Sequence, residues 1–149
     1  MFAPKHILVP TDFSEYSDAA LQKAVDIAAQ CESKVYLLHV VTQQYQQFGV
    51  DYSLTSQLVT QLEKESLKGA KAKLKKEADA IVKSKGLKIS FDIKVGIPHE
   101  LILSEQKAKK VDLIVISSHG KTGLLKQLIG SVTEKVVKGA RCPVMVVKP

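Results

Sequence analysis

Apolar residues in this chain form short continuous runs, separated by longer stretches in which they recur at helical spacing. Runs of strand length occupy residues 6–10, 35–41, 113–116 and 144–147. The last two are apolar at every position, a pattern typical of strands buried on both faces of a parallel sheet. In residues 89–95 apolar and polar side chains alternate, which predicts a half-exposed strand at an edge of the sheet.

The stretch after the first strand predicts a helix with a face of small residues. Ala20, Ala24 and Ala28 recur at a spacing of four, which would let this helix pack closely on a sheet. Either Ser14 or Ser17 can serve as its N-cap, because a serine hydroxyl accepts a bond from a first-turn N–H group.

A long helix is predicted over residues 57–85, after a polar stretch at 42–56 that is typical of a loop. Its apolar stripe consists of Val59, Leu62, Leu67, Ala70, Leu74, Ala78 and Ile81. Gly86 stands where a helix commonly ends, and Pro98 suits the first turn of the next helix.

Strands and helices therefore alternate along the chain, which favours an α/β fold with a parallel sheet and right-handed crossovers. At 149 residues the chain is expected to form one domain, residues 1–149. In such a sheet ligands bind beyond the carboxyl ends of the strands, where the strand order reverses.

Composition excludes several classes of protein. Two cysteines provide no disulfide framework, so a reducing cytoplasm is the expected location. No apolar run reaches the length of a membrane span, so a membrane partner is not expected. The net charge is +7, but many lysines lie between Lys64 and Lys88 among acidic residues. Such mixing is typical of a solvated helix face, so nucleic acid is not the expected partner.

The most informative stretch is residues 111–149, in which a loop containing Gly120, Gly123 and Gly130 joins two strands. Ser131-Val132-Thr133-Glu134 reads as a capping box, which predicts Ser131 as the N-cap of the last helix. Free N–H groups at a helix N-terminus, next to a glycine, are suited to binding phosphate.

This stretch resembles the nucleotide-binding motif of the universal stress protein family, Gly-x2-Gly-x9-Gly-[Ser/Thr]. Gly120, the nine residues after it, Gly130 and Ser131 match, whereas Ser117 stands in place of the first glycine. The resemblance also covers residues 9–14, 38–40 and 95–100. It implies a five-stranded parallel sheet of order 3-2-1-4-5 with helices on both faces, Rossmann-like and similar to the adenine nucleotide alpha hydrolases.

The resemblance further implies an ATP- or AMP-binding stress-response or signalling module that dimerises through its last strand. The residues implied to bind the nucleotide are Pro10, Thr11, Asp12, Val40, Gly96, Ser117, Ser118, His119, Gly120, Lys121, Thr122, Gly123, Gly130, Ser131, Val132 and Thr133. A magnesium or manganese ion accompanying the nucleotide would be held by phosphates and water rather than by a cage of protein side chains.

Two alternatives stay open. The first is a slow ATP hydrolase in which His119 or Asp12 assists water, although no nucleophile, base and orienting group stand together in the pattern. The second is an interaction module that binds no nucleotide. This alternative stays open because Ser117 replaces the first glycine of the motif. Gly120-Lys121-Thr122 imitates only the end of a P-loop, because the motif's first glycine would fall at Val115.

Overall fold

The structure of the chain, a computed structural model, describes residues 1–42, 55–120 and 129–149, with side chains from Thr60 onward in the second range. Its elements are β1 (His6–Thr11), α1 (Glu15–Cys31), β2 (Lys34–Val41), α2 (Thr55–Lys85), β3 (Ile89–Val95), α3 (Pro98–Ala108), β4 (Leu113–Ser117), α4 (Ser131–Gly139) and β5 (Val144–Val147). Every strand and helix expected from the sequence is present, within one or two residues of the predicted bounds where these were given. Most of the expected loop at 42–56 lies outside the described residues.

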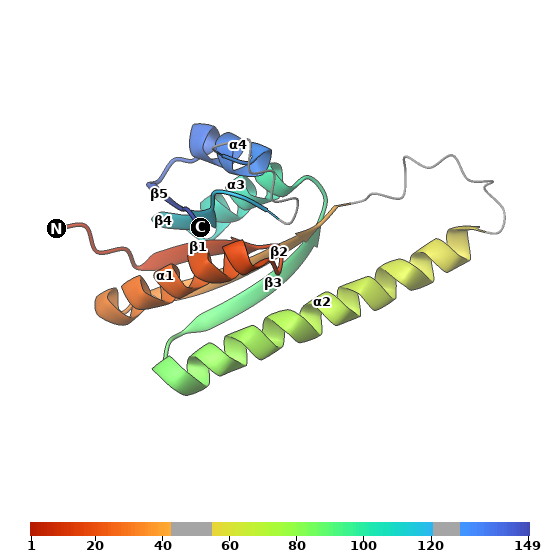
Figure 1. The fold of residues 1–149 in the computed structure, drawn as a ribbon, viewed down its shortest axis with the longest axis horizontal. Helices are drawn as coiled ribbons and strands as arrows, with labels where there is room; N and C mark the ends of the chain where they lie inside the picture. The colour runs from red at the N-terminus through yellow and green to blue at the C-terminus, as the bar shows by residue number, and fades with distance from the viewer. Residues whose placement is uncertain (43–54, 121–128) are drawn as a thin grey trace.

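The five strands form one parallel sheet in the order β3-β2-β1-β4-β5, which confirms the order 3-2-1-4-5. Two layers of helices enclose it, with α1 and α2 on one face and α3 and α4 on the other (Figure 1). The strand order reverses between β1 and β4, so the carboxyl ends of these two strands mark the place where α/β folds bind ligands.

Alternating side chains of the central strand divide the core into two halves. Ile7 and Val9 of β1 pack toward α1 and α2, whereas Leu8 packs toward α3 and α4. All three are fully buried, as expected for a strand covered on both faces. No helix of the described residues is long and apolar enough to cross a membrane.

The two edge strands are less buried than the central ones. The half-exposed edge strand predicted at 89–95 is confirmed as β3. The expectation that residues 144–147 are buried on both faces is wrong, because β5 forms the other edge and 40% of Met145 is exposed. The apolar stripe of α2 is also covered only in part. Ala70, Leu74, Ala78 and Ile81 are buried, whereas Leu62, nearer the N-terminus of α2, is 43% exposed. The N-terminal end of α2 reaches past the strands (Figure 1).

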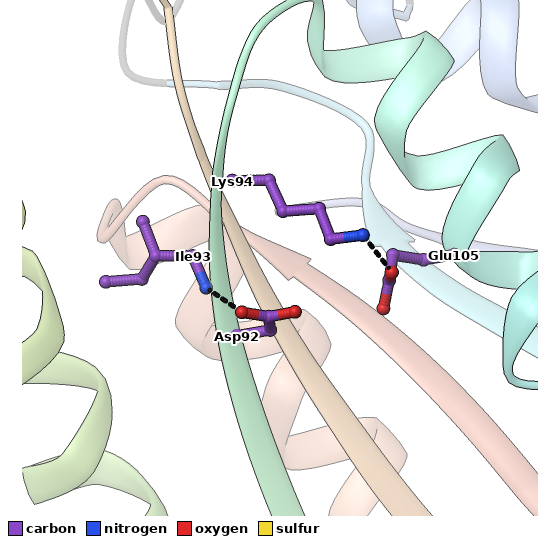
Figure 2. Close-up of polar contacts among 4 residues, drawn as sticks. All are labelled: Asp92, Ile93, Lys94 and Glu105. Atoms are coloured by element: carbon purple, nitrogen blue, oxygen red, sulfur yellow. Dashed lines mark hydrogen bonds and ion pairs between the residues drawn. The ribbon is translucent and has the colours of Figure 1, made fainter.

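A largely buried ion pair ties the edge strand β3 to α3. Lys94 reaches across from β3 to Glu105, whose side chain is only 5% exposed (Figure 2). Next to Glu105, the Gln106 side chain accepts a bond from Arg141 N–H at 3.2 Å, close to the start of β5. Two adjacent polar residues of α3 thus hold elements near both edges of the sheet.

Candidate functional site

The loop after β1 is shaped by side-chain bonds to its own backbone. Asp12 Oδ1 accepts bonds from the N–H of Ser14 at 3.0 Å and from its hydroxyl, as in an Asx turn. Thr11 Oγ1 accepts the N–H of Phe13 at 3.1 Å, while Phe13 itself has a left-handed φ of 62°. Of the two predicted caps of α1, Ser14 is the N-cap and accepts the N–H of Ser17 at 3.2 Å. These bonds fix the Asp12 carboxylate beyond the end of β1.

The backbone at Gly120 lies directly against that carboxylate. A Cβ atom at Gly120 would stand 2.9 Å from Asp12 Oδ2, a separation that real Cβ atoms do not adopt. Asp12 follows β1 and Gly120 follows β4, so this contact joins the two loops at the reversal of strand order. Only a glycine allows such an approach without a shift of Asp12.

Ser117, the residue that replaces the motif's first glycine, turns its hydroxyl inward to the loop. Its Oγ donates to the carbonyl oxygen of His119 at 2.8 Å. The neighbouring Ser118 is fully buried, and its hydroxyl bonds His119 Nδ1 at 2.7 Å. Tyr16 of α1 lies beside the His119 ring, with 6.0 Å between ring centroids. The two serines therefore hold the backbone and the imidazole of His119.

The N-terminus of α4 is drawn onto the same loop. Gly130 N–H donates to Ser118 O at 2.7 Å, and Thr133 Oγ1 donates to Ser117 O at 2.7 Å. A Cβ atom at Gly130 would stand 3.3 Å from Ser118 O, so the two chain segments are close. The first turn of α4 thus lies next to residues 117–118.

The predicted capping box at Ser131 is wrong. Glu134 N–H bonds Gly130 O at 3.0 Å, so Gly130, with φ −68° and ψ 157°, is the N-cap and Ser131 is the first helical residue. Glu134 instead pairs with Lys138 one turn on, at 2.6 Å, which lowers the pKa of Glu134. No described side chain caps α4. The N–H groups of its first turn are therefore available to an anion.

Eight of the residues named from the sequence come together in these two adjoining loops and the start of α4: Thr11, Asp12, Ser117, Ser118, His119, Gly120, Gly130 and Thr133. Ser131 and Val132 adjoin it as the first residues of α4. Pro10, Val40 and Gly96 lie at the same edge of the sheet, at or just past the ends of β1, β2 and β3. Lys121, Thr122 and Gly123 lie outside the described residues.

Three contributors were not assigned to the site from the sequence. His39 Nδ1 bonds Thr11 O at 2.8 Å, and the Phe13 ring packs on the His39 ring with centroids 4.5 Å apart. Tyr16 contacts His119 from α1. Each contact joins residues of different elements or loops, so no spacing in the sequence could have revealed it. Within the described residues no three His, Cys, Asp or Glu side chains could hold a metal ion.

The comparisons with known proteins agree on one family. The family model described as "Universal stress protein family" matches residues 4–148. Universal stress protein MJ0531 of Methanocaldococcus jannaschii is 39% identical, over 97% of this chain and 82% of its own length. The structure of UspA from Lactobacillus plantarum superposes with a TM-score of 0.83 at 26% identity, covering 96% of this chain and 97% of that one. A universal stress protein from Archaeoglobus fulgidus, solved in complex with dAMP, shares the fold with a TM-score of 0.68 at 20% identity, covering 99% of this chain and 100% of that one.

Proposed function

Because this chain belongs to the universal stress protein family, we propose that it binds an adenine nucleotide, ATP or AMP, and acts as a nucleotide-dependent stress-response or signalling module. The proposed site is the crevice beyond the carboxyl ends of β1 and β4, and the reversal of strand order there supports it. The fold relative in complex with dAMP supports an adenine nucleotide as the ligand.

The observation that carries this proposal is the N-terminus of α4, which no described side chain caps and which packs against residues 117–118. Gly130 as N-cap offers no side chain to the first-turn N–H groups, and its own N–H anchors it to Ser118 O at 2.7 Å. The N–H groups of Ser131, Val132 and Thr133, with the positive end of the helix dipole, would bind the phosphates. The Ser131 hydroxyl stands beside them, on an exposed residue.

The nucleoside would lie nearer β1 and β2. The Asp12 carboxylate, fixed by Ser14 and pressed against Gly120, is placed to accept hydrogen bonds from ribose hydroxyls. The backbone at Val40 would contact the adenine, as the family resemblance implies. Gly96, with φ 152° and its N–H bonded to Val41 O at 3.0 Å, would close that side of the site. Pro10 and Thr11 would form its floor.

Binding rather than turnover is the proposed activity. Ser118 is fully buried, so its bond to His119 orients the imidazole instead of creating an accessible nucleophile. A magnesium or manganese ion arriving with the nucleotide would be held mainly by the phosphates and water. The alternative is slow ATP hydrolysis in which His119 assists a water molecule. The bond from Ser118 that orients the His119 ring is compatible with this alternative.

We further propose that the protein works in the cytoplasm as a homodimer formed through β5. Cys31 and Cys142 are free thiols, which fits a reducing compartment. β5 pairs with β4 on one side only, and its Met145 is exposed. Two copies of such an edge can pair about a twofold axis.

The proposal is tested by native mass spectrometry of the protein purified without added nucleotide, followed by denaturation and identification of released small molecules. Release of ATP, ADP or AMP is the expected result. The contrary result is a protein that releases no nucleotide and binds neither ATP nor AMP when each is added at millimolar concentration. That result would favour the alternative, an interaction module that binds no nucleotide.

A further inference from the structure

Cationic side chains gather at the edge of the sheet opposite the candidate nucleotide site. All strands of a parallel sheet begin at one edge, and here each strand is preceded or opened by a Lys or Arg. These residues are Lys5 before β1, Lys34 opening β2, Lys88 before β3, Lys109 and Lys110 before β4, and Arg141 before β5. Together these six residues are termed the basic edge.

Hydrogen bonds between strand starts place these residues side by side. Lys34 N–H donates to Lys5 O at 2.8 Å, and Val35 N–H donates to Lys88 O at 2.9 Å. At the start of β4, Asp112 N–H donates to His6 O at 3.0 Å. The basic edge therefore follows the strand order as a row, and four strand spacings give it a length of about 19 Å.

The row keeps a net positive charge. Five of the six side chains belong to exposed residues, and Lys34 is half-buried. Two acidic residues stand near them in the chain, Glu32 two residues before Lys34 and Asp112 two residues after Lys110, and Asp112 accepts the backbone N–H groups of Lys5 and His6. Six cationic residues thus outnumber two acidic ones.

Aromatic contacts hold part of the row in place. The Lys34 Nζ lies 4.9 Å from the centroid of the Tyr36 ring, and the Lys109 Nζ lies 6.0 Å from it. Such cation–π contacts reduce the freedom of two long side chains before any partner binds. The Tyr36 ring is therefore occupied by ammonium groups, and is not presented as a platform for a stacked base.

The helix dipole accounts for only part of this row. Lysines often compensate the negative ends of helices, and the last turns of α2 and α3 contain Lys83, Lys85 and Lys107 for that purpose. Lys5 Nζ also donates to the carbonyl oxygen of Cys31, the last residue of α1, at 3.1 Å, and Lys109 is the C-cap of α3. Lys34 and Arg141, however, stand at strand starts and belong to no helix.

We propose that the basic edge binds the phosphate backbone of a nucleic acid without reading its sequence. A linear row of cations fits a linear polyanion, and each strand of a duplex presents a phosphate about every 3.4 Å. A lipid surface would instead favour cations spread over a plane. From the sequence only the mixed charges of residues 64–88 were weighed, whereas the hydrogen bonds between strand starts place the basic edge in one row.

The test compares two triple variants of equal charge. One is Lys88→Gln/Lys109→Gln/Lys110→Gln on the basic edge. The other is Lys64→Gln/Lys68→Gln/Lys71→Gln on the exposed surface of α2, away from that edge. Binding to a fluorescein-labelled mixed-sequence DNA duplex of about 20 base pairs is followed by fluorescence anisotropy between about 50 and 200 mM salt.

We expect the unmodified protein to bind the duplex with a strong salt dependence. Loss of three phosphate contacts lowers the slope of log K against log salt by about 2.7, and weakens binding at low salt at least about tenfold. The α2 triple variant keeps the slope within about one unit of the unmodified protein.

Three results would overturn the proposal: no duplex binding by the unmodified protein at about 50 mM salt, an equal loss of binding in both triple variants, or binding to phosphatidylserine vesicles that depends on the basic edge without binding to the duplex. The ATP affinity of the triple variant on the basic edge is measured as well. We expect it to be unchanged, so that failure of this proposal can be told apart from failure of the proposed nucleotide site.

Discussion

At the scale of single residues, Ser117 decides how far this loop departs from the motif it resembles. Its side chain stands where a glycine is expected, yet the hydroxyl donates to His119 O at 2.8 Å and so remains within the loop. We expect a side chain held in this way neither to block a nucleotide nor to bond it directly. The substitution is therefore compatible with nucleotide binding.

The variant Ser117→Gly tests this assignment. Because the hydroxyl supports the loop and not the ligand, we expect the ATP affinity to stay within about threefold of the unmodified protein, less than 1 kcal/mol. Isothermal titration calorimetry measures the change. A loss of tenfold or more would instead mean that the hydroxyl contacts the nucleotide.

Some residues of the candidate site were predictable from the sequence and others were not. Asp12, Gly120 and Gly130 could be grouped in advance because parallel strands place their following loops at one edge. The bonds of His39 to Thr11 and of Ser118 to His119 depend on side-chain orientation, which no spacing encodes. The cap of α4 was misassigned by one residue, since Ser-x-x-Glu does not determine which residue adopts the extended N-cap dihedrals.

At the scale of elements, the ion pair between β3 and α3 stabilises an otherwise open edge of the sheet. Lys94→Met leaves the Glu105 carboxylate buried without its partner. We expect the free energy of unfolding to fall by about 1–3 kcal/mol, less than for a fully buried pair because Lys94 is 33% exposed. Urea denaturation measures the change.

The chain offers a matched control for that variant. Lys138→Met breaks the pair with Glu134 on the surface of α4, where the side chains are 73% and 56% exposed. Its expected effect on the free energy of unfolding is much smaller than that of Lys94→Met, as for other exposed i,i+4 pairs. Equal losses in the two lysine variants would contradict a stabilising role for the β3–α3 pair.

A second prediction for an element concerns α2, in which the Glu77 side chain is partly buried. Burial raises the pKa of Glu77 above its ordinary value of 4.5, Asp18 adds to the rise, and Lys73 opposes it. Glu77 Oε2 is buried without a hydrogen-bond partner. A raised pKa means that the folded state binds the proton more tightly than the unfolded state.

Glu77 therefore favours folding while protonated, and this contribution is lost as pH rises through the raised pKa. We expect Glu77→Gln to increase the free energy of unfolding at pH 7 by up to about 1 kcal/mol, with the gain shrinking toward pH 4. Thermal unfolding followed at several pH values checks the sign. A gain that is constant across this range would point to packing instead of charge.

The elements themselves were largely predictable, because hydrophobic periodicity encodes them directly. The burial of β5 was not, because its continuous apolar run predicted burial on both faces although the strand order implied by the resemblance places this strand at an edge. The sequence also does not show how much of the apolar stripe of α2 is covered by the rest of the protein, and Leu62 of that stripe is exposed.

At the scale of the whole molecule, the open edge of β5 bears on assembly. Pro143 O and Val147 O accept bonds from β4, so the peptide groups of Val144 and Val146, which alternate with them, face away from the sheet. Val146→Pro therefore removes an outward donor while leaving the pairing with β4 in place.

We expect the unmodified protein to be a dimer and Val146→Pro to be a monomer in light scattering at tens of micromolar. Val146→Ala, which keeps the N–H group, serves as the control and should remain dimeric. An unmodified chain that is monomeric under these conditions would end the proposal of assembly through β5.

The central claim, that the loop after β4 and the start of α4 bind an adenine nucleotide, is tested most directly by titration calorimetry of the unmodified protein and Gly130→Val with ATP and AMP. Valine fits the extended dihedrals at Gly130, but its Cβ would stand 3.3 Å from Ser118 O beside the proposed phosphate site. The control is Gly69→Val, on α2, where a Cβ meets nothing within 4 Å.

We predict saturable binding by the unmodified protein and by Gly69→Val, and at least about tenfold weaker binding by Gly130→Val, roughly 1.4 kcal/mol, with the fold intact by circular dichroism. Equal nucleotide affinities in all three proteins would contradict the placement of the phosphates, and no binding by the unmodified protein would contradict the account as a whole.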